Sequence, residues 1–420
     1  MKGKVQIFFE RITPSLNKIG ENKYLQAIMG AMMTLLGPII LGSFATLVGV
    51  WATAAKMTNI QKVAGNVSNV TINLIALYFS FLMAKSLVKL FTKDDDGTTA
   101  GIISLMSFLI LTSLGQIKDG KNLINALPTT WLSSQGVFSA MIIVLIVGRF
   151  YIYIKQHGWT IKMPEGVPPM VSNAFAALIP AIVIGILDAG LSYLFMQTSW
   201  GSIHQMIYSL IQVPLRGLGG TIGAMILVSL IMQILWFFGI HGTNVVLPLV
   251  TPIWLSMDME NLAAIQAGHA APNTIGLAFL NIATFGGTAL GLVIIMLFAK
   301  SKRYKQLGRL SLVPAIFGIT EPVIFGTSLV LNFNFAIPFI TNNTVALIIS
   351  YVLVKVGLIP HFSGAQPIFG LPVGVHATAG GSVSIVVLQL VINLILAPIL
   401  WYPWLRHADK KALAEEHVSE

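Results

Sequence analysis

Long apolar stretches recur along the whole chain and restrict its fold to one class. Crossing a hydrocarbon core of about 30 Å takes roughly 18 or more consecutive, mostly apolar residues in a helix. The candidate spans are 25–51, 70–90, 98–114, 137–154, 171–196, 221–238, 274–299, 335–356 and 383–405. Charged residues make up only 10% of the 420, whereas soluble domains carry about 25%. The sequence therefore predicts an all-α polytopic protein of the lipid bilayer and excludes a soluble enzyme.

The positive charges gather in short segments between the apolar stretches. "KSKRYKQLGR" (300–309) holds five of them, the chain opens on the basic stretch "MKGKVQIFFERI", and Arg406, Lys410 and Lys411 follow the last span. Cytoplasmic loops of membrane proteins show this excess of Lys and Arg. We expect both termini and residues 300–309 in the cytoplasm, an even number of crossings and no cleaved signal peptide. Cytoplasmic loops account for the net charge of +10, so we do not expect a nucleic-acid partner.

The sequence lacks the residues that several kinds of chemistry require. The chain has no cysteine and no GxxxxGK[ST] loop, which excludes disulfides, thiolate sites, a phosphocysteine and a loop of this kind for ATP. His269, His361 and His376 have neither helical spacing nor clustered carboxylates, so they do not predict a metal site. We therefore expect no metal, no cofactor and no catalytic residue within this chain.

Two apolar segments contain too many glycines and prolines for a simple span. One is "GIHGTNVVLPLVTPIWLSMD" (239–258) and the other is "SLVPAIFGITEPVIFGTSLVLNF" (311–333). Phe-Gly-Ile followed by polar residues occurs at 238–240, where the first segment begins, and again at 317–319 within the second. Broken helices at membrane depth occur where they are buried in protein or line a cavity, and paired breaks indicate a transporter's binding site. We expect both segments to be discontinuous and to contribute to one site.

Glu321 is the only acid between Leu310 and Leu405. An acid at the middle of a membrane helix costs about 2.5–3.5 kcal/mol on insertion scales and normally faces a cavity, a partner or a substrate. Pro322 disfavours helix at Glu321 and suits the start of a new one. We expect Glu321, next to Thr320, to bind a polar ligand at a helix break. The alternative is a structural carboxylate that pairs with Lys355 or caps a helix.

His241 lies in the other broken segment. Its neutral imidazole can donate one hydrogen bond and accept another, which suits a hydroxyl-rich ligand as well as a structural role. Asn244 is close in sequence, and we expect it to contribute to the binding site. Trp236 could stack on a sugar ring or serve only for packing. Asp188 in "IGILDAGLSY" is expected to be structural.

Four stretches together give a family resemblance: "ENKYLQAIMGAMMTLLGPIILGS", "PPMVSNAFAALIPA", "WFFGIHG" and "FGITEPVIFG". With them the chain resembles the membrane C component of bacterial phosphotransferase-system sugar permeases, in the lactose/cellobiose/diacetylchitobiose branch. The likeness covers residues 5–406. It implies about ten transmembrane helices, with two re-entrant hairpins in the C-terminal half. It also implies a bacterial cell-membrane location.

The resemblance further implies that different segments of the chain have different roles. Residues 1–199 would form an N-terminal bundle that makes a homodimer, 200–219 an amphipathic linker, 220–406 the transport domain and 407–420 a cytoplasmic tail. The family's sugar contacts map onto Glu321, His241 and Trp236, with Thr320 where the family usually has Asn. A separate cytoplasmic B subunit, supplied by an upstream A subunit, would phosphorylate the sugar, expected to be a disaccharide.

Two other functions fit the same residues. Glu321 could bind a proton in an ion-coupled secondary transporter, or the chain could be a non-transporting sensor or channel with the same fold. Neighbouring genes for B and A components would favour the phosphotransferase function over both.

Overall fold

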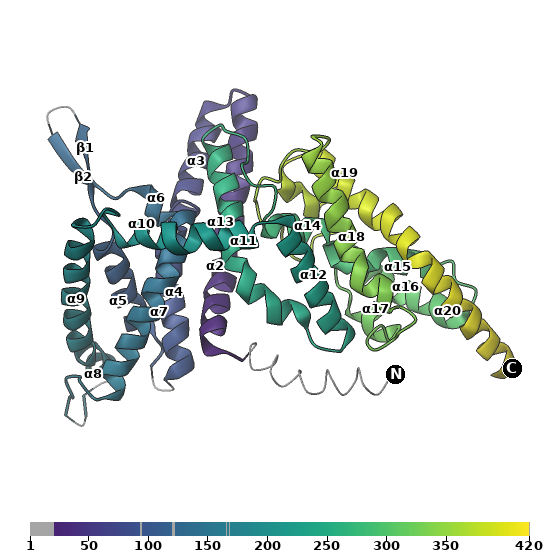
Figure 1. Ribbon diagram of the computed structural model, residues 1–420, viewed down its shortest axis with the longest axis horizontal. Helices are drawn as coiled ribbons and strands as arrows, with labels where there is room; N and C mark the ends of the chain where they lie inside the picture. The colour runs from purple at the N-terminus through teal and green to yellow at the C-terminus, as the bar shows by residue number, and fades with distance from the viewer. Residues whose placement is uncertain (1–20, 93–94, 120–121, 165, 168, 420) are drawn as a thin grey trace. The chain divides into compact units, whose positions relative to one another are not determined.

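Helices make up most of the regular structure in the computed structural model (Figure 1). The structure describes the chain except residues 1–20, 93–94, 120–121, 165, 168 and 420, so the basic segment 1–12 lies outside it. The described residues form two compact units. The N-terminal unit contains 21–45 and 55–217, and the C-terminal unit contains 46–54 and 218–419.

The N-terminal unit is built mainly of helices, in chain order. Helix α2 (Lys23–Ala54) contributes its first part, and Pro38 lies inside this helix without ending it. The others are α3 (Thr58–Thr71), α4 (Ile75–Phe91), α5 (Thr98–Ile110), α6 (Thr129–Leu132), α7 (Ser134–Gln156), α8 (Pro169–Ala176), α9 (Leu178–Met196), α10 (Ile203–Ile207), a π-helix (Tyr208–Gln212) and α11 (Val213–Gly219), whose end belongs to the C-terminal unit.

Helix α4 lies at the centre of this unit and packs against α5 and α7. Its side chains Phe79, Met83 and Leu87 are fully buried. The loop that follows α4 is tied to α7 by Asp95, which accepts a hydrogen bond from Tyr151 Oη at 3.0 Å and pairs with Lys155 Nζ at 2.6 Å. A charged pair thus fixes one end of an otherwise apolar helix packing.

A β-hairpin interrupts the helices of the N-terminal unit, and the expectation of an all-α chain is wrong at this point. Strand β1 (Gly115–Asp119) pairs antiparallel with β2 (Asn122–Ala126), with Gly115 opposite Ala126. This stretch lies between the candidate spans 98–114 and 137–154 and belongs to neither. Its Asp-Gly dipeptide is typical of hairpin turns. Most residues of the two strands are exposed, so the sequence shows no alternation of apolar and polar residues that would predict strands here.

The segment predicted as an amphipathic linker is helical. It comprises α10, the π-helix and α11. His204 of α10 is fully buried, with Nε2 3.0 Å from Thr112 Oγ1, Nδ1 2.7 Å from Ser139 Oγ and its ring stacked on Trp131. These contacts attach the first part of the linker to the N-terminal unit.

The C-terminal unit holds the remaining helices, several of them short or interrupted. They are α12 (Ile222–Phe237), α13 (Gly242–Gln266), α14 (Leu277–Ala283), a 3-10 turn (Phe285–Thr288), α15 (Ala289–Met296), α16 (Lys302–Ile316), α17 (Glu321–Gly326), α18 (Ala336–Lys355), a second 3-10 turn (His376–Gly380), α19 (Val383–Val391), a π-helix (Ile392–Leu396) and α20 (Ala397–Ser419).

A buried polar cluster joins distant segments of the C-terminal unit. The Asp258 carboxylate on α13 is almost wholly buried and accepts hydrogen bonds from Gln366 Nε2 and from the Ala278 N–H, each at 2.8 Å. Gly276 packs so closely on it that a Cβ there would lie 1.9 Å from Asp258 Oδ1. The loop containing Gln366 is thereby held against α13 and α14.

The structure confirms the polytopic helical architecture in its main features. Among the described residues, seven helices are long and apolar enough to cross a membrane, or eight if 203–237 is one span. The total of ten helices stays a prediction. Helix α5 is 13 residues long, shorter than the predicted 98–114. Helix α13 runs through Pro248 and Pro252, so the expectation that 239–258 is discontinuous holds only up to His241.

The predicted domain division also stays a prediction. Along the chain, the boundary between the two units lies between residues 217 and 218, near the end of the expected linker, and 46–54 belongs to the C-terminal unit. Residues 407–419, expected to be a tail, continue helix α20. Asp409 near this end accepts hydrogen bonds from the N–H groups of Lys300 and Ser301 at 2.8 and 2.9 Å, so this end of α20 contacts the start of α16.

Candidate functional site

Helices α12 and α16 end with the same backbone arrangement. Gly239 (φ +84°) and Gly318 (φ +76°) adopt the left-handed conformation just past each helix end. Each glycine N–H bonds to the carbonyl three residues earlier, at 3.0 and 3.1 Å, and the N–H of the next isoleucine bonds to the carbonyl five residues earlier, at 2.9 and 3.0 Å. This is the Schellman pattern, which favours glycine because it lacks a Cβ. The repeated Phe-Gly-Ile therefore marks two equivalent helix ends.

After the first break, His241 caps the start of α13. Its Nδ1 accepts a hydrogen bond from the Asn244 N–H at 3.3 Å. A histidine whose Nδ1 is an acceptor carries its proton on Nε2 when it is neutral. The cap therefore leaves Nε2–H as the donor that His241 can offer to a ligand.

After the second break, α17 begins at Glu321 with Pro322 in its first turn. The predicted helix break is present, and the new helix starts at Glu321 itself, one residue before Pro322. The start of a helix favours a negative charge, because unpaired N–H groups and the helix dipole point toward it. The local backbone thus offsets part of the cost of placing a carboxylate here.

A third break, which the sequence analysis did not predict, separates α14 from α15. Gly286, Gly287 and Thr288 have φ values of +52°, +59° and +58°. Threonine in this region is strained by about 1–2 kcal/mol, and such strain concentrates at functional sites. Trp401 Nε1 donates to the Thr288 carbonyl at 3.2 Å and fastens the turn to α20. The sequence "TFGGT" (284–288), with its two adjacent glycines, is the feature that could have predicted this break.

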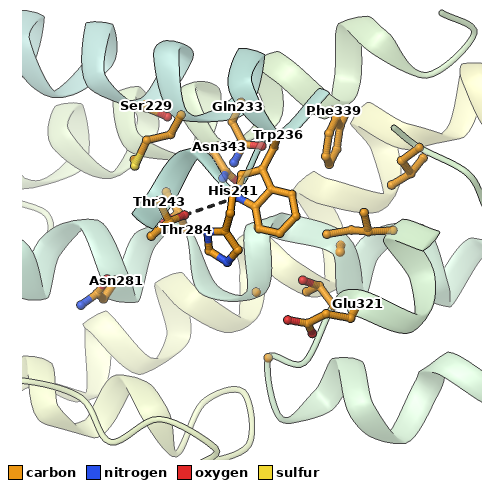
Figure 2. A pocket seen from close by; sticks show the side chains of 18 of the residues that line it. Ser229, Gln233, Trp236, His241, Thr243, Asn281, Thr284, Glu321, Phe339 and Asn343 are labelled. Atoms are coloured by element: carbon orange, nitrogen blue, oxygen red, sulfur yellow. Dashed lines mark hydrogen bonds between the residues drawn. The ribbon is translucent and has the colours of Figure 1, made fainter. Parts of the chain in front are cut away.

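The three breaks border one cavity of about 310 Å³ (Figure 2). Trp236, His241, Thr320 and Glu321 line it, so four of the five predicted site residues are together. Asn244, the fifth, is not among the lining residues, and its exposed side chain follows the His241 cap. The other lining residues are Ser229, Met232, Gln233, Thr243, Leu247, Leu280, Asn281, Thr284, Gly286, Gly287, Ala289, Gly318, Ile324, Leu329, Phe339, Asn343, Phe369 and Trp401.

Trp236 and His241 form an aromatic corner of this cavity. Their ring centroids are 4.3 Å apart at an interplanar angle of 47°, and Trp236 Nε1 donates to Thr243 Oγ1 at 3.4 Å. Figure 2 shows the indole and the imidazole on the same side of the cavity as this hydrogen bond. The indole N–H is thus occupied, which leaves the apolar ring of Trp236 as the surface available to a ligand.

The Glu321 carboxylate has no partner in the part of the chain that the structure describes. It makes no hydrogen bond and no ion pair there, and its side chain is exposed to the cavity. The alternative partner, Lys355, instead lies with Nζ 5.6 Å from the centre of the Tyr351 ring. The lining residues include neither lysine nor arginine. Glu321 therefore gives the cavity a net negative charge with nothing on its walls to balance it.

Neutral amide side chains complete the polar part of the lining, and sequence reasoning missed them. Gln233 of α12, Asn281 of α14 and Asn343 of α18 all line the cavity. Asn343 is 7% exposed, yet its Oδ1 has no hydrogen-bond partner. A buried carbonyl oxygen without a donor costs about 1–3 kcal/mol. The pair "NN" at 342–343, within an otherwise apolar span, was the signal that could have revealed it.

The residues around the cavity fit one class of ligand. Glu321 only accepts hydrogen bonds, His241 Nε2–H donates, and the amides do both. Anions are disfavoured by the unbalanced carboxylate. No group of three or more His, Asp or Glu side chains that could hold a metal occurs among the described residues. The arrangement suits an uncharged ligand with several hydroxyl groups and an apolar face for Trp236.

The chain is similar to known proteins over nearly its whole length. The oligo-beta-mannoside-specific EIIC component of the Bacillus subtilis phosphotransferase system is 34% identical, covering 97% of this chain and 96% of the relative. The cellobiose-specific EIIC component of Geobacillus stearothermophilus is 32% identical, covering 99% and 96%.

A lactose-specific EIICB component of Staphylococcus aureus is 30% identical, and the match covers 99% of this chain but 74% of that relative. A solved structure is also similar: the transporter ChbC, the IIC component from the N,N'-diacetylchitobiose-specific phosphotransferase system. It has a TM-score of 0.89 and 34% identity, covering 98% of this chain and 99% of that one. The family model described as "Phosphotransferase system, EIIC" matches residues 29–342. On these grounds the chain belongs to the phosphotransferase-system EIIC family of membrane permeases.

Proposed function

We propose that this permease binds a disaccharide in the cavity at Glu321 and carries it inward for phosphorylation. The observation that supports this most is the unpartnered Glu321 carboxylate in a cavity without lysine or arginine. A carboxylate can accept several hydroxyl hydrogen bonds, and charge-assisted bonds are about twice as strong as neutral ones. The relatives that are named for cellobiose, lactose and diacetylchitobiose support a disaccharide.

In this proposal Glu321, Thr320, His241 and Trp236 contact the sugar, as the sequence predicts, and the structure adds Asn343 as a candidate. Glu321 would accept from one or two hydroxyls, His241 Nε2–H would donate to another, and the indole of Trp236 would cover a ring face. Asn343 Oδ1 would accept from a hydroxyl and so gain the donor that it lacks in the described chain. The role of Asn244 stays a prediction.

The phosphoryl group would come from another subunit. The chain has no cysteine and no phosphate-binding loop of the GxxxxGK[ST] kind, so we propose a separate cytoplasmic B subunit that is supplied by an A subunit. Phosphoryl transfer depends mainly on positioning and charge stabilisation, and this chain would supply the position of the sugar hydroxyl. Purified protein with ATP or phosphoenolpyruvate alone should yield no sugar phosphate.

The proposed membrane arrangement has ten crossings, two re-entrant hairpins in the C-terminal half and both termini in the cytoplasm of a bacterium. The Lys and Arg cluster at 300–309 supports this orientation, and the helix breaks next to the cavity support re-entrant segments. In the cysteine-free chain, Arg303→Cys should react with an impermeant thiol reagent only from the cytoplasmic side. Labelling from outside alone would reverse the orientation.

We further propose that the protein is a homodimer joined through residues 1–199. This rests on the family, because small-residue stretches such as 30–37 suit packing within one subunit equally well. Native mass measurement in a mild detergent should give twice the mass of the chain. A stable monomer that binds sugar would argue against this arrangement.

The central test is sugar binding by the purified full-length chain. Isothermal titration with cellobiose, lactose, N,N'-diacetylchitobiose and their component monosaccharides should identify at least one disaccharide that binds. Uptake into vesicles that also contain the matching B and A proteins should then yield the sugar phosphate. Uptake of unmodified sugar driven by a proton gradient, without those proteins, would support the ion-coupled alternative instead.

A further inference from the structure

A second cavity of about 230 Å³, here called the second chamber, adjoins the candidate site. Five residues line both cavities, namely Asn281, Thr284, Gly286, Gly318 and Phe369. Two of these five are glycines in direct backbone contact, because a Cβ on Gly286 would lie 3.3 Å from the Gly318 Cα. The chambers therefore meet where the turn after α14 touches the turn after α16, at two positions that carry no side chain.

The lining of the second chamber resembles that of the first in chemistry. Phe285, Phe317 and Phe369 supply aromatic rings, whereas Asn281, Thr284 and His376 supply neutral polar groups. The lining contains no charged residue apart from the titratable His376. Binding pockets typically combine an apolar and aromatic wall with a few placed polar groups. The second chamber is thus built for an uncharged ligand rather than for an ion.

Gln389 on α19 fixes which nitrogen of His376 can donate. Its side chain is fully buried, with Oε1 accepting from the Gly374 N–H at 2.8 Å and Nε2 donating to the Ile282 carbonyl at 3.0 Å. Because both backbone partners have fixed roles, the amide cannot be reversed. The same Nε2 lies 3.1 Å from His376 Nδ1, which must accept.

The neutral His376 ring therefore carries its proton on Nε2. This atom donates to no group in the described part of the chain. The ring borders the second chamber and makes a T-shaped contact with Phe285. One buried amide thus sets which nitrogen of His376 faces a ligand as a donor.

The first cavity is small for a disaccharide, and the second chamber adds space beside it. Sites that enclose ligands of drug-like size have volumes of about 300–1,000 Å³, so a cavity of 310 Å³ lies at the lower limit for a disaccharide. The adjoining 230 Å³ provides room for a second ring next to the first.

We propose that the second chamber is a second sugar subsite, in which His376 Nε2–H donates to a hydroxyl of the ring that lies away from Glu321. Gln389 is then a positioning residue that sets the tautomer of His376. This inference rests on the proposed function and assigns the preference for two rings over one to the second chamber. A monosaccharide would occupy only the first chamber.

The test compares His376→Phe with wild type in the purified full-length chain. Phenylalanine keeps the ring against Phe285 but has no nitrogen. Titration with the tightest-binding disaccharide of the panel should show an affinity about 3- to 10-fold lower, as expected for one lost neutral hydrogen bond. The component monosaccharide, measured directly or by competition, should bind as it does to wild type.

Two further variants separate a ligand role from a structural one. His269→Phe changes an exposed loop histidine outside both chambers and should leave both affinities unchanged, whereas His376→Gln returns an amide donor and should recover part of the disaccharide affinity. Unchanged disaccharide binding in His376→Phe, or an equal loss for both sugars, would overturn the second subsite. If wild type binds no sugar of the panel, the proposed function fails instead.

Discussion

Replacing Glu321 by glutamine tests the assignment that the whole binding model depends on. The substitution keeps the shape of the side chain but removes its charge and one acceptor. Because the carboxylate has no hydrogen bond or ion pair in the described chain, its loss removes only the favourable interaction of the charge with the start of α17. We therefore expect the free energy of unfolding to fall by less than about 1 kcal/mol.

Binding should respond quite differently. A hydrogen bond to a charged group contributes about 1.5–3 kcal/mol, and each 1.4 kcal/mol is about a tenfold change in affinity. Glu321→Gln should therefore weaken disaccharide binding by roughly 10- to 100-fold in isothermal titration, and uptake should fall with it. Glu415→Gln, an exposed charge loss on α20 away from the cavity, is the matched control and should bind normally.

Two results would refute this reasoning in different ways. A folded Glu321→Gln protein with unchanged sugar affinity would show that the carboxylate is not a sugar ligand. A protein destabilised by Glu321→Gln and restored by adding Lys355→Met would instead show that the two residues balance each other. The structure, which places Lys355 over Tyr351, leads us to expect neither.

Three further predictions follow from the same contacts. Asn343→Leu should lower sugar affinity about 3- to 10-fold while thermal stability in detergent stays equal or rises, because a buried oxygen without a donor is removed; lower stability would mean that Asn343 has a structural role. Gly276→Ala should destabilise the fold by about 3 kcal/mol or more, since its Cβ would lie 1.9 Å from Asp258 Oδ1 within a buried hydrogen-bond network, and an unchanged melting temperature would contradict this packing. The phosphorylated sugar should bind at least about tenfold more weakly than the sugar, because a phosphate adds about −1.5 to −2 charges beside Glu321 in a cavity without lysine or arginine; Glu321→Gln should narrow this difference, and equal binding of both ligands to wild type would rule the repulsion out.

The positions of the first helix breaks could be predicted from the sequence because their causes are local. Gly318 permits the left-handed turn that ends α16, and Pro322 suits the first turn of α17, so the break around Glu321 depends on residues only a few positions apart. The cost of a charge among apolar residues likewise drew the prediction to Glu321, which lines the cavity, without any knowledge of its neighbours.

Local sequence patterns predicted helix breaks less reliably where tertiary packing determines the backbone conformation. Pro248 and Pro252 indicated a discontinuous segment, yet α13 continues through both, because neighbouring groups in a packed helix can compensate for the hydrogen bonds that proline removes. The turn at Gly286–Thr288 was missed because a threonine in the left-handed region is unfavourable by itself and persists only when surrounding structure holds it.

The sequence by itself determined the membrane class and the helix breaks next to Glu321 and His241, because hydropathy and backbone preference act over short distances along the chain. Only the tertiary structure decided which polar side chains share the cavity. Asn281, Asn343 and Gln389 are ordinary amides in their own helices. Asn281 is notable for the two cavities that it lines, Asn343 for an oxygen without a donor, and Gln389 for a partner 107 residues away. Whether a buried polar group is satisfied depends on where distant segments pack, and no local pattern records that.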